Sequence, residues 1–98
     1  KPIASIVSNP DLLQHNFVIG SPGSLEKIGS AADAIITNPK AIEMNYVPQT
    51  NDILAASKLL DPGTVAVIKI NPLKPGKYPY ICTFPGHWRI MQGHLEVK

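Results

Sequence analysis

The segment CTFPGHWRIM, Cys82–Met91, concentrates side chains that bind transition metals. It holds the only cysteine of the chain, one of three histidines and one of two methionines. The thiolate, imidazole and thioether of Cys82, His87 and Met91 form a soft, mixed donor set. This set suits copper better than magnesium or calcium, and the thioether disfavours a structural zinc site. Two histidines and a cysteine with a weak axial methionine form a blue-copper electron-transfer site, so this spacing predicts one if a second histidine is available.

His15 is the expected second histidine. It opens the β-rich run HNFVI, and its distance in sequence from Cys82 is no objection because neighbouring strands of a sandwich are often far apart in sequence. His94 is the competitor, but it lies in the last predicted strand and fits an exposed strand position better. Met44 lies in a predicted helix, where we expect it to pack rather than bind metal.

The elements that must position these side chains are mainly strands. Apolar runs predict strands or extended segments at residues 3–7, 15–19, 53–60, 64–70, within 74–84, and 93–98. Most of the ten prolines fall between these runs. Cys82 ends one predicted strand and Met91 precedes the next. Strands at both ends of the segment therefore hold its ligands in place.

Two helices are expected after the second strand. Ser21 is predicted to cap the first and Pro22 to open it, and apolar residues recur at helical spacing from Leu25 to Ile36. A short second helix is predicted from Pro39 to about Tyr46. Charged residues of these helices, such as Asp33, are expected to face solvent. The order β-β-α-α-β-β-β-β fits an antiparallel sandwich with a helical insertion.

Composition narrows the function classes. At 98 residues and 44% hydrophobic content, the chain is expected to form a single domain. A net charge of +2 gives no support for a nucleic-acid or anionic-membrane partner, and the apolar runs are too short to span a bilayer. One cysteine excludes an internal disulfide. Because the chain starts at Lys1, we interpret it as a mature or excised product.

The segments HNFVI and YPYICTFPGHWRIMQGHLEVK resemble the cupredoxin family and, within it, the azurins. The resemblance covers about residues 3–98 and implies a mainly all-β, cupredoxin-like antiparallel Greek-key β-sandwich with one type 1 copper. It implies that His15, Cys82 and His87 bind copper in a plane and that Met91 approaches axially. The backbone carbonyl of Gln14 is implied as a weak contact on the other axial side, where azurins usually have glycine.

Residues around the ligands also have expected roles. Asn16 is placed to hydrogen-bond Thr83 and so join the two ligand-bearing segments. The backbone N–H of Phe84 is the expected donor to the Cys82 sulfur, since Pro85 has none.

Trp88 follows His87, where azurins commonly have a small residue. It is interpreted either as a packing residue or as part of an exposed apolar docking surface with Phe84 and Pro85.

The predicted domain, residues 1–98, is short at its N-terminal end. Only one strand precedes His15, and about six are predicted where the family has seven or eight. A missing strand leaves unpaired backbone groups at a sheet edge. We therefore expect either that the chain is part of a longer polypeptide, or that a second chain or a symmetric copy completes the sheet.

The function expected from these features is electron transfer, as a carrier or as a domain of a larger redox protein. Four protein ligands leave no open position for a substrate, and three histidines are too few for a second copper, so no enzyme is expected. Copper transport or storage is the alternative. The expected partners are redox proteins such as a cytochrome or a copper enzyme. The resemblance implies a periplasmic or otherwise extracytoplasmic location.

Overall fold

The computed structural model describes residues 3–9 and 13–97. Within these ranges the elements are β1 (Ile3–Ser8), β2 (Val18–Gly20), α1 (Leu25–Ile35), β3 (Ile53–Ala56), β4 (Val65–Ile70), β5 (Gly76–Ile81) and β6 (Gln92–Val97). The pairs β1–β4, β2–β3, β2–β5 and β5–β6 are all antiparallel. The predicted antiparallel β fold with a helical insertion after the second strand is confirmed.

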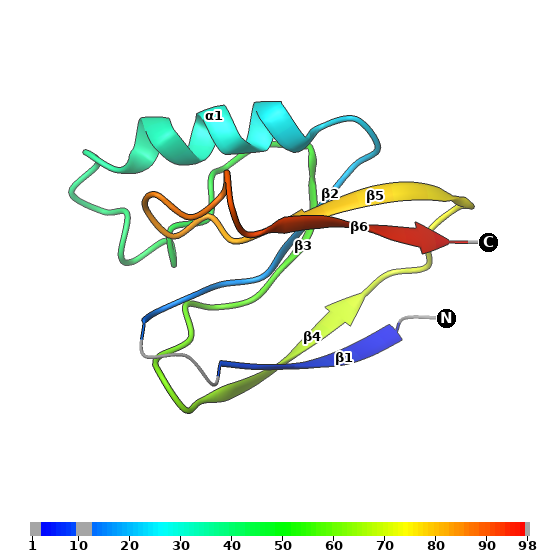
Figure 1. Ribbon diagram of the computed structural model, residues 1–98, viewed down its shortest axis with the longest axis horizontal. Coiled ribbons are helices and arrows are strands. Elements are labelled where there is room, and N and C mark those ends of the chain that lie inside the picture. Colours follow the sequence, from blue (N-terminus) through cyan, green and yellow to red (C-terminus); the bar gives the residue numbers. More distant parts are fainter. Residues whose placement is uncertain (1–2, 10–12, 98) are drawn as a thin grey trace.

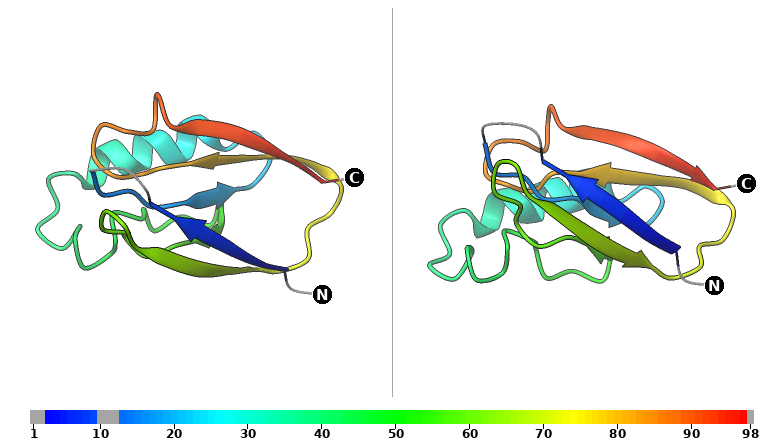
Figure 2. Two further views of the ribbon diagram at one scale, coloured as in Figure 1. Left: turned by 60° about the horizontal axis from the view of Figure 1, so that its bottom comes forward. Right: turned by 90° about the horizontal axis from the view of Figure 1, so that it is seen from below.

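The elements form three layers (Figure 1). Helix α1 lies along one face of a four-stranded sheet with the order β3-β2-β5-β6, and the two-stranded sheet β1-β4 lies on the other face. Figure 2 shows β1 and β4 in front of the larger sheet when the molecule is seen from below. Both faces of the central strands β2 and β5 are therefore covered.

Two apolar clusters hold these layers together. Val18 of β2 packs with Ile28 of α1 on the helix side of the sheet. Its neighbour Ile19 packs with Tyr78 of β5 and Ile68 of β4 between the two sheets. Successive residues of a strand point to opposite faces, so β2 has to be apolar on both. The continuous apolar run in the sequence follows from this double burial.

Helix α1 begins three residues later than expected, at Leu25 with Ser24 as its N-cap. Gly23 has a φ of 78°, and the Ser24 N–H donates to the Ser21 carbonyl over 3.1 Å. Pro22 and Gly23 thus occupy the centre of a β-turn, where proline followed by a residue with positive φ is favoured. Pro22 belongs to this turn, and the prediction that it opens the helix is wrong.

The predicted second helix is also wrong, because residues 39–46 form a succession of turns. Asn45 and Tyr46 both have a φ of 56°, which ends any helical path. Long-range hydrogen bonds hold Asn45 in this conformation. Its carbonyl accepts from the Asn16 side chain, and the side-chain oxygen of Asn45 accepts from the Leu59 N–H. These tertiary bonds outweigh the local helical pattern.

No helix in residues 3–9 and 13–97 is long and apolar enough to cross a membrane.

Candidate metal centre

The pairing of β2 with β5 brings the predicted ligands together. Val18 is paired with Ile81 in antiparallel register, so the residues before Val18 and those after Ile81 lie at the same end of the sheet. His15 precedes β2 and Cys82 follows β5. The segment Cys82–Met91, here called the ligand loop, connects β5 to β6 at this end (Figure 1).

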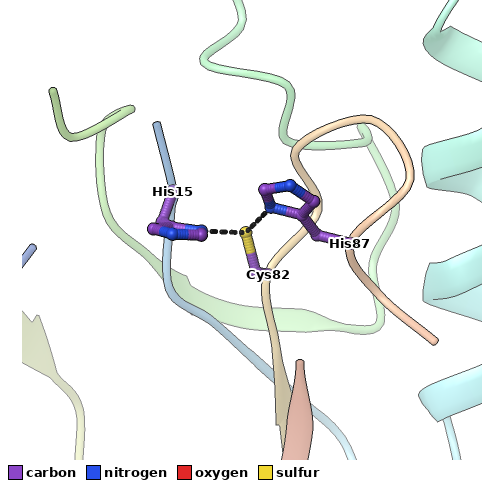
Figure 3. Close-up of side chains that lie close together, drawn as sticks. All are labelled: His15, Cys82 and His87. Carbon is purple, nitrogen blue, oxygen red and sulfur yellow. Dashed lines mark hydrogen bonds between the residues drawn. The ribbon is translucent and has the colours of Figure 1, made fainter. Parts of the chain in front are cut away.

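Three of the predicted ligands converge on one point (Figure 3). The Cys82 sulfur lies 3.7 Å from Nδ1 of His15 and 3.6 Å from Nδ1 of His87. The potential ligand atoms of these residues all lie within 4.8 Å of one another. Cys82 is 3% exposed and both imidazoles are half-buried. The centre is therefore a compact donor set that is largely removed from solvent.

The spacing of the donor atoms fits a trigonal metal site. Metal–sulfur bonds of about 2.3 Å and metal–imidazole bonds of about 2.0 Å, set about 120° apart, place sulfur and nitrogen about 3.7 Å from each other. The two observed separations, 3.7 and 3.6 Å, agree with this value. Two imidazoles and a thiolate in this arrangement are the donors of a blue-copper site. The residues therefore fit one copper ion.

Met91 lies at the same site. Its carbonyl accepts a hydrogen bond of 3.0 Å from the Cys82 N–H, which closes the ligand loop on itself. Met91 and Cys82 also line one open apolar pocket with side chains of β5 and of the loop. Met91 is thus held next to Cys82, and its thioether as the weak axial ligand stays a prediction.

His15 is fixed by its own backbone. It forms an isolated antiparallel bridge with Leu60, in which the His15 N–H donates over 3.1 Å and the Leu60 N–H donates back over 2.7 Å. The predicted strand 15–19 is thus only partly regular, since β2 starts at Val18. The side chain of Gln14 points to Asp61, with Nε2 donating to Oδ1 over 2.6 Å.

Asn16 joins the two ligand-bearing segments. Its side-chain oxygen accepts from the Thr83 N–H over 2.7 Å, and its Nδ2 donates to Thr83 Oγ1 over 2.8 Å. Nδ2 also donates to the Asn45 carbonyl over 2.8 Å. Asn16 is 5% exposed and Thr83 is 1% exposed, so these bonds form away from water. His15 and Cys82 are thereby held in a fixed relation.

The Cys82 sulfur receives two backbone hydrogen bonds. The Asn16 N–H donates to it over 3.4 Å, and the Phe84 N–H is a second donor. Burial raises the pKa of the Cys82 thiol above its ordinary value, and these two hydrogen bonds partly oppose the rise. The thiol is consequently protonated at neutral pH until a metal replaces the proton.

Aromatic side chains surround His87. Its ring centroid lies 4.9 Å from those of His15 and Phe84, and Phe84 in turn meets Tyr46 edge-on at 5.3 Å. Phe84 and Pro85 are half-buried beside it. An apolar surface therefore adjoins the imidazole.

Sequence reasoning missed two contributors to this site. Asn45 was assigned to the predicted second helix. Asparagine tolerates a positive φ, so its position near the end of that helix was a signal for a turn. Asp33 was expected to face solvent, yet it accepts a hydrogen bond from Trp88. Nothing in the local sequence pairs Asp33 with Trp88.

Comparisons with known proteins agree with this geometry. A family model described as a cupredoxin-like domain matches residues 27–97. Auracyanin-A of Chloroflexus aurantiacus is 33% identical over 92 residues, which cover 93% of this chain and 55% of that protein. Azurin of Pseudomonas aeruginosa is 27% identical over 92 residues, covering 90% of this chain and 59% of that protein. The chain thus spans little more than half the length of these two relatives.

A solved structure of auracyanin A, described as a "blue" copper protein from Chloroflexus aurantiacus, superimposes on this chain with a TM-score of 0.85. It is 30% identical, and the match covers all of this chain and 79% of that one. The predicted fold is thereby confirmed. The predicted cofactor, one type 1 copper, is also supported by the position of the donor residues.

The protonated thiol makes copper binding dependent on pH. At neutral pH we expect about one proton to be released from Cys82 for each copper bound, because the thiolate is the metal ligand. Since the pKa of the thiol is raised, affinity for copper should increase with pH throughout the range below that pKa. Calorimetry in buffers of different ionisation enthalpy measures the proton count. In the control variant Cys82→Ser, copper binding should release one proton fewer. An unchanged proton count in that variant would contradict the assignment of Cys82 as a ligand.

Proposed function

The chain belongs to the cupredoxin family, and on that premise we propose that it carries single electrons. Bound copper supplies a one-electron Cu(II)/Cu(I) couple. The residues that we assign as its ligands are His15, Cys82, His87 and Met91. The observation that carries the proposal is the pair of sulfur–nitrogen separations, 3.7 and 3.6 Å, which match a trigonal metal site.

A rigidly held donor set favours rapid electron transfer. Cys82 and His15 are tied together through Asn16, and the ligand loop is closed by the bond from the Cys82 N–H to the Met91 carbonyl. Side chains held in this way move little when the charge of the site changes. A small rearrangement means a small barrier to gaining or losing an electron.

The hydrogen bonds to sulfur bias the redox equilibrium. The Asn16 and Phe84 N–H groups place positive dipole ends at the Cys82 sulfur. They favour the more electron-rich reduced site and so raise the reduction potential.

The imidazole of His87 is the proposed route for electrons to reach a partner. Phe84 and Pro85 supply the apolar surface beside it, and such a surface suits brief encounters with a redox protein such as a cytochrome or a copper enzyme. Trp88 was interpreted either as part of this surface or as a packing residue. It lies half-buried against α1, which favours the packing role. The fifth contact from the Gln14 carbonyl stays a prediction.

The cellular context is also a proposal. The chain is either a free carrier or an electron-transfer domain of a larger redox protein, and it has no enzymatic activity of its own. Copper bound by a thiolate favours an extracytoplasmic, periplasmic-type location. A second copy that completes the sheet stays a prediction, as does the domain boundary at residues 1–98.

Electron self-exchange between copies of the chain tests the proposed route without an identified partner. Pro85→Asp places like charges where two copper sites must approach, so we expect self-exchange to slow by about tenfold. NMR line broadening in mixtures of oxidised and reduced protein measures this rate. Val67→Asp adds the same charge to an exposed position on β4, in the other sheet, and should leave it unchanged. Equal slowing by both variants would contradict the route.

A further inference from the structure

The ligand loop is fastened to helix α1 through one carboxylate. Trp88 Nε1 donates to Asp33 Oδ1 over 3.1 Å, and the Arg89 guanidinium contacts Asp33 Oδ2 at 3.0 Å. Asp33 lies near the end of α1, and the two donors are the residues directly after His87. Figure 3 shows the part of the loop that carries His87 running beside this helix.

The indole of Trp88 is seated on the helix as well as bonded to it. It packs with Val18 and Ile28 in the cluster between α1 and the sheet. Gly29 lies under the ring, and a Cβ at this position would overlap the indole. The glycine therefore leaves room for the ring to lie close to the helix backbone.

Arg89 contributes less to this contact. Its guanidinium lies 4.6 Å from the centre of the Trp88 ring, but its side chain is 65% exposed. Exposed ion pairs are screened by water and contribute little to stability. The bond between Trp88 and Asp33 is the part that fixes the loop.

The position of Trp88 links this bond to the metal centre. The His87 carbonyl accepts from the Ile90 N–H and from the Met91 N–H, at 3.1 and 2.8 Å, so residues 87–91 form one tight turn. Asn16 holds the start of the ligand loop at Thr83. The attachment to Asp33 holds its far half, which contains two of the proposed ligands.

We propose that Asp33 is a positioning residue, which sets the placement of His87 and Met91 by holding Trp88 against α1. The inference rests on the proposed copper site, but the bond itself joins two side chains that are not among the proposed ligands. Asp33 does not touch the donor atoms, and it acts through the backbone of the turn that follows His87.

The first test uses the protein without copper. Trp88 is the only tryptophan, so the NMR spectrum contains one indole N–H signal and its exchange with solvent reports this bond alone. In Asp33→Ala we expect indole exchange to quicken by about tenfold or more, as for the loss of a bond to a charged acceptor. The backbone amides of His87 and Met91 should exchange faster too. In Asp33→Asn the side-chain oxygen still accepts from the indole, so the indole N–H and the two loop amides should again exchange slowly with solvent.

The second test uses the copper-loaded protein. Because the axial ligand tunes the potential, Asp33→Ala should shift both the visible spectrum and the reduction potential. Asp33→Asn should restore both. Arg89→Gln removes the ion pair and keeps the indole bond, and should match the unsubstituted protein. Should Asp33→Ala fail to fold, Trp88→Phe keeps the ring over Gly29, removes the donor, and should show the same loop and spectral changes.

Two results would overturn the inference. One is unchanged exchange of the indole and of the His87 and Met91 amides in Asp33→Ala. The other is faster exchange of the indole N–H in Asp33→Ala while the exchange of the loop amides, the visible spectrum and the reduction potential stay unchanged. Asp33 would then hold Trp88 without positioning the ligands. If the unsubstituted protein shows no blue copper band, the proposed function fails, and the amide exchange measured without copper still decides the role of Asp33.

Discussion

Cys82→Ser is expected to abolish the blue copper site and the redox couple with it. Serine replaces a soft thiolate by a hydroxyl that stays protonated, so the strongest donor of the set is lost. Even changes to the outer partners of metal ligands cost 10–100-fold in affinity, so we expect copper affinity to fall by more than about a hundredfold. The intense visible band should disappear. Absorption spectra and calorimetry with one equivalent of Cu(II) measure both effects.

His94→Gln is the matched control for this result. His94 is exposed on β6 opposite Pro79, apart from the three convergent ligands. The variant should keep the band, the affinity and the potential. Loss of the band in His94→Gln, or its survival in Cys82→Ser, would contradict the assigned ligand set.

Asn16→Ala is expected to produce the largest loss of stability. Its side chain makes three hydrogen bonds, two to Thr83 and one to Asn45, and Ala would leave the buried Thr83 N–H without its acceptor. Unsatisfied buried groups cost about 1–3 kcal/mol each, so we expect the free energy of unfolding to fall by about 3 kcal/mol. Urea denaturation of the copper-free protein measures the change.

The copper site of this variant should change as well. Without the Asn16 side chain, the two bonds that tie the His15 segment to Thr83 of the ligand loop are lost, and the visible band should broaden or shift. Asn38→Ala is the control, since Asn38 is exposed and its side chain accepts one local bond from the Lys40 N–H. Asn38→Ala should lower the free energy of unfolding by well under half as much as Asn16→Ala. Equal losses in the two variants would argue against the proposed link.

The site was largely predictable because most of it is contiguous. Cys82, His87 and Met91 lie within ten residues, so their donor types could be assigned together. His15 required a judgement between two histidines, and the better fit of His94 to an exposed position in the last predicted strand decided it. Strand patterns also predicted the six strands in their order along the chain, because alternation and double burial leave a local signal.

Two of the errors arose where long-range bonds outweighed the local pattern. Residues 39–46 looked helical, but Asn45 bonds to Asn16 and Leu59 in a left-handed conformation. Asp33 looked like a solvent-facing helix residue, and its bond to Trp88 spans 55 positions. The partners in these interactions depend on how the layers pack, and a local sequence window does not identify them.

The measurement that tests the central claim most directly is a redox cycle followed by visible absorption. The protein is loaded with one equivalent of Cu(II), reduced stepwise with ascorbate, and reoxidised. We predict an intense blue band that bleaches with one electron per chain, returns in full on reoxidation and survives repeated cycles with copper retained. A pale or absent band, or copper released on reduction, would contradict electron transfer, and release would favour copper transport or storage.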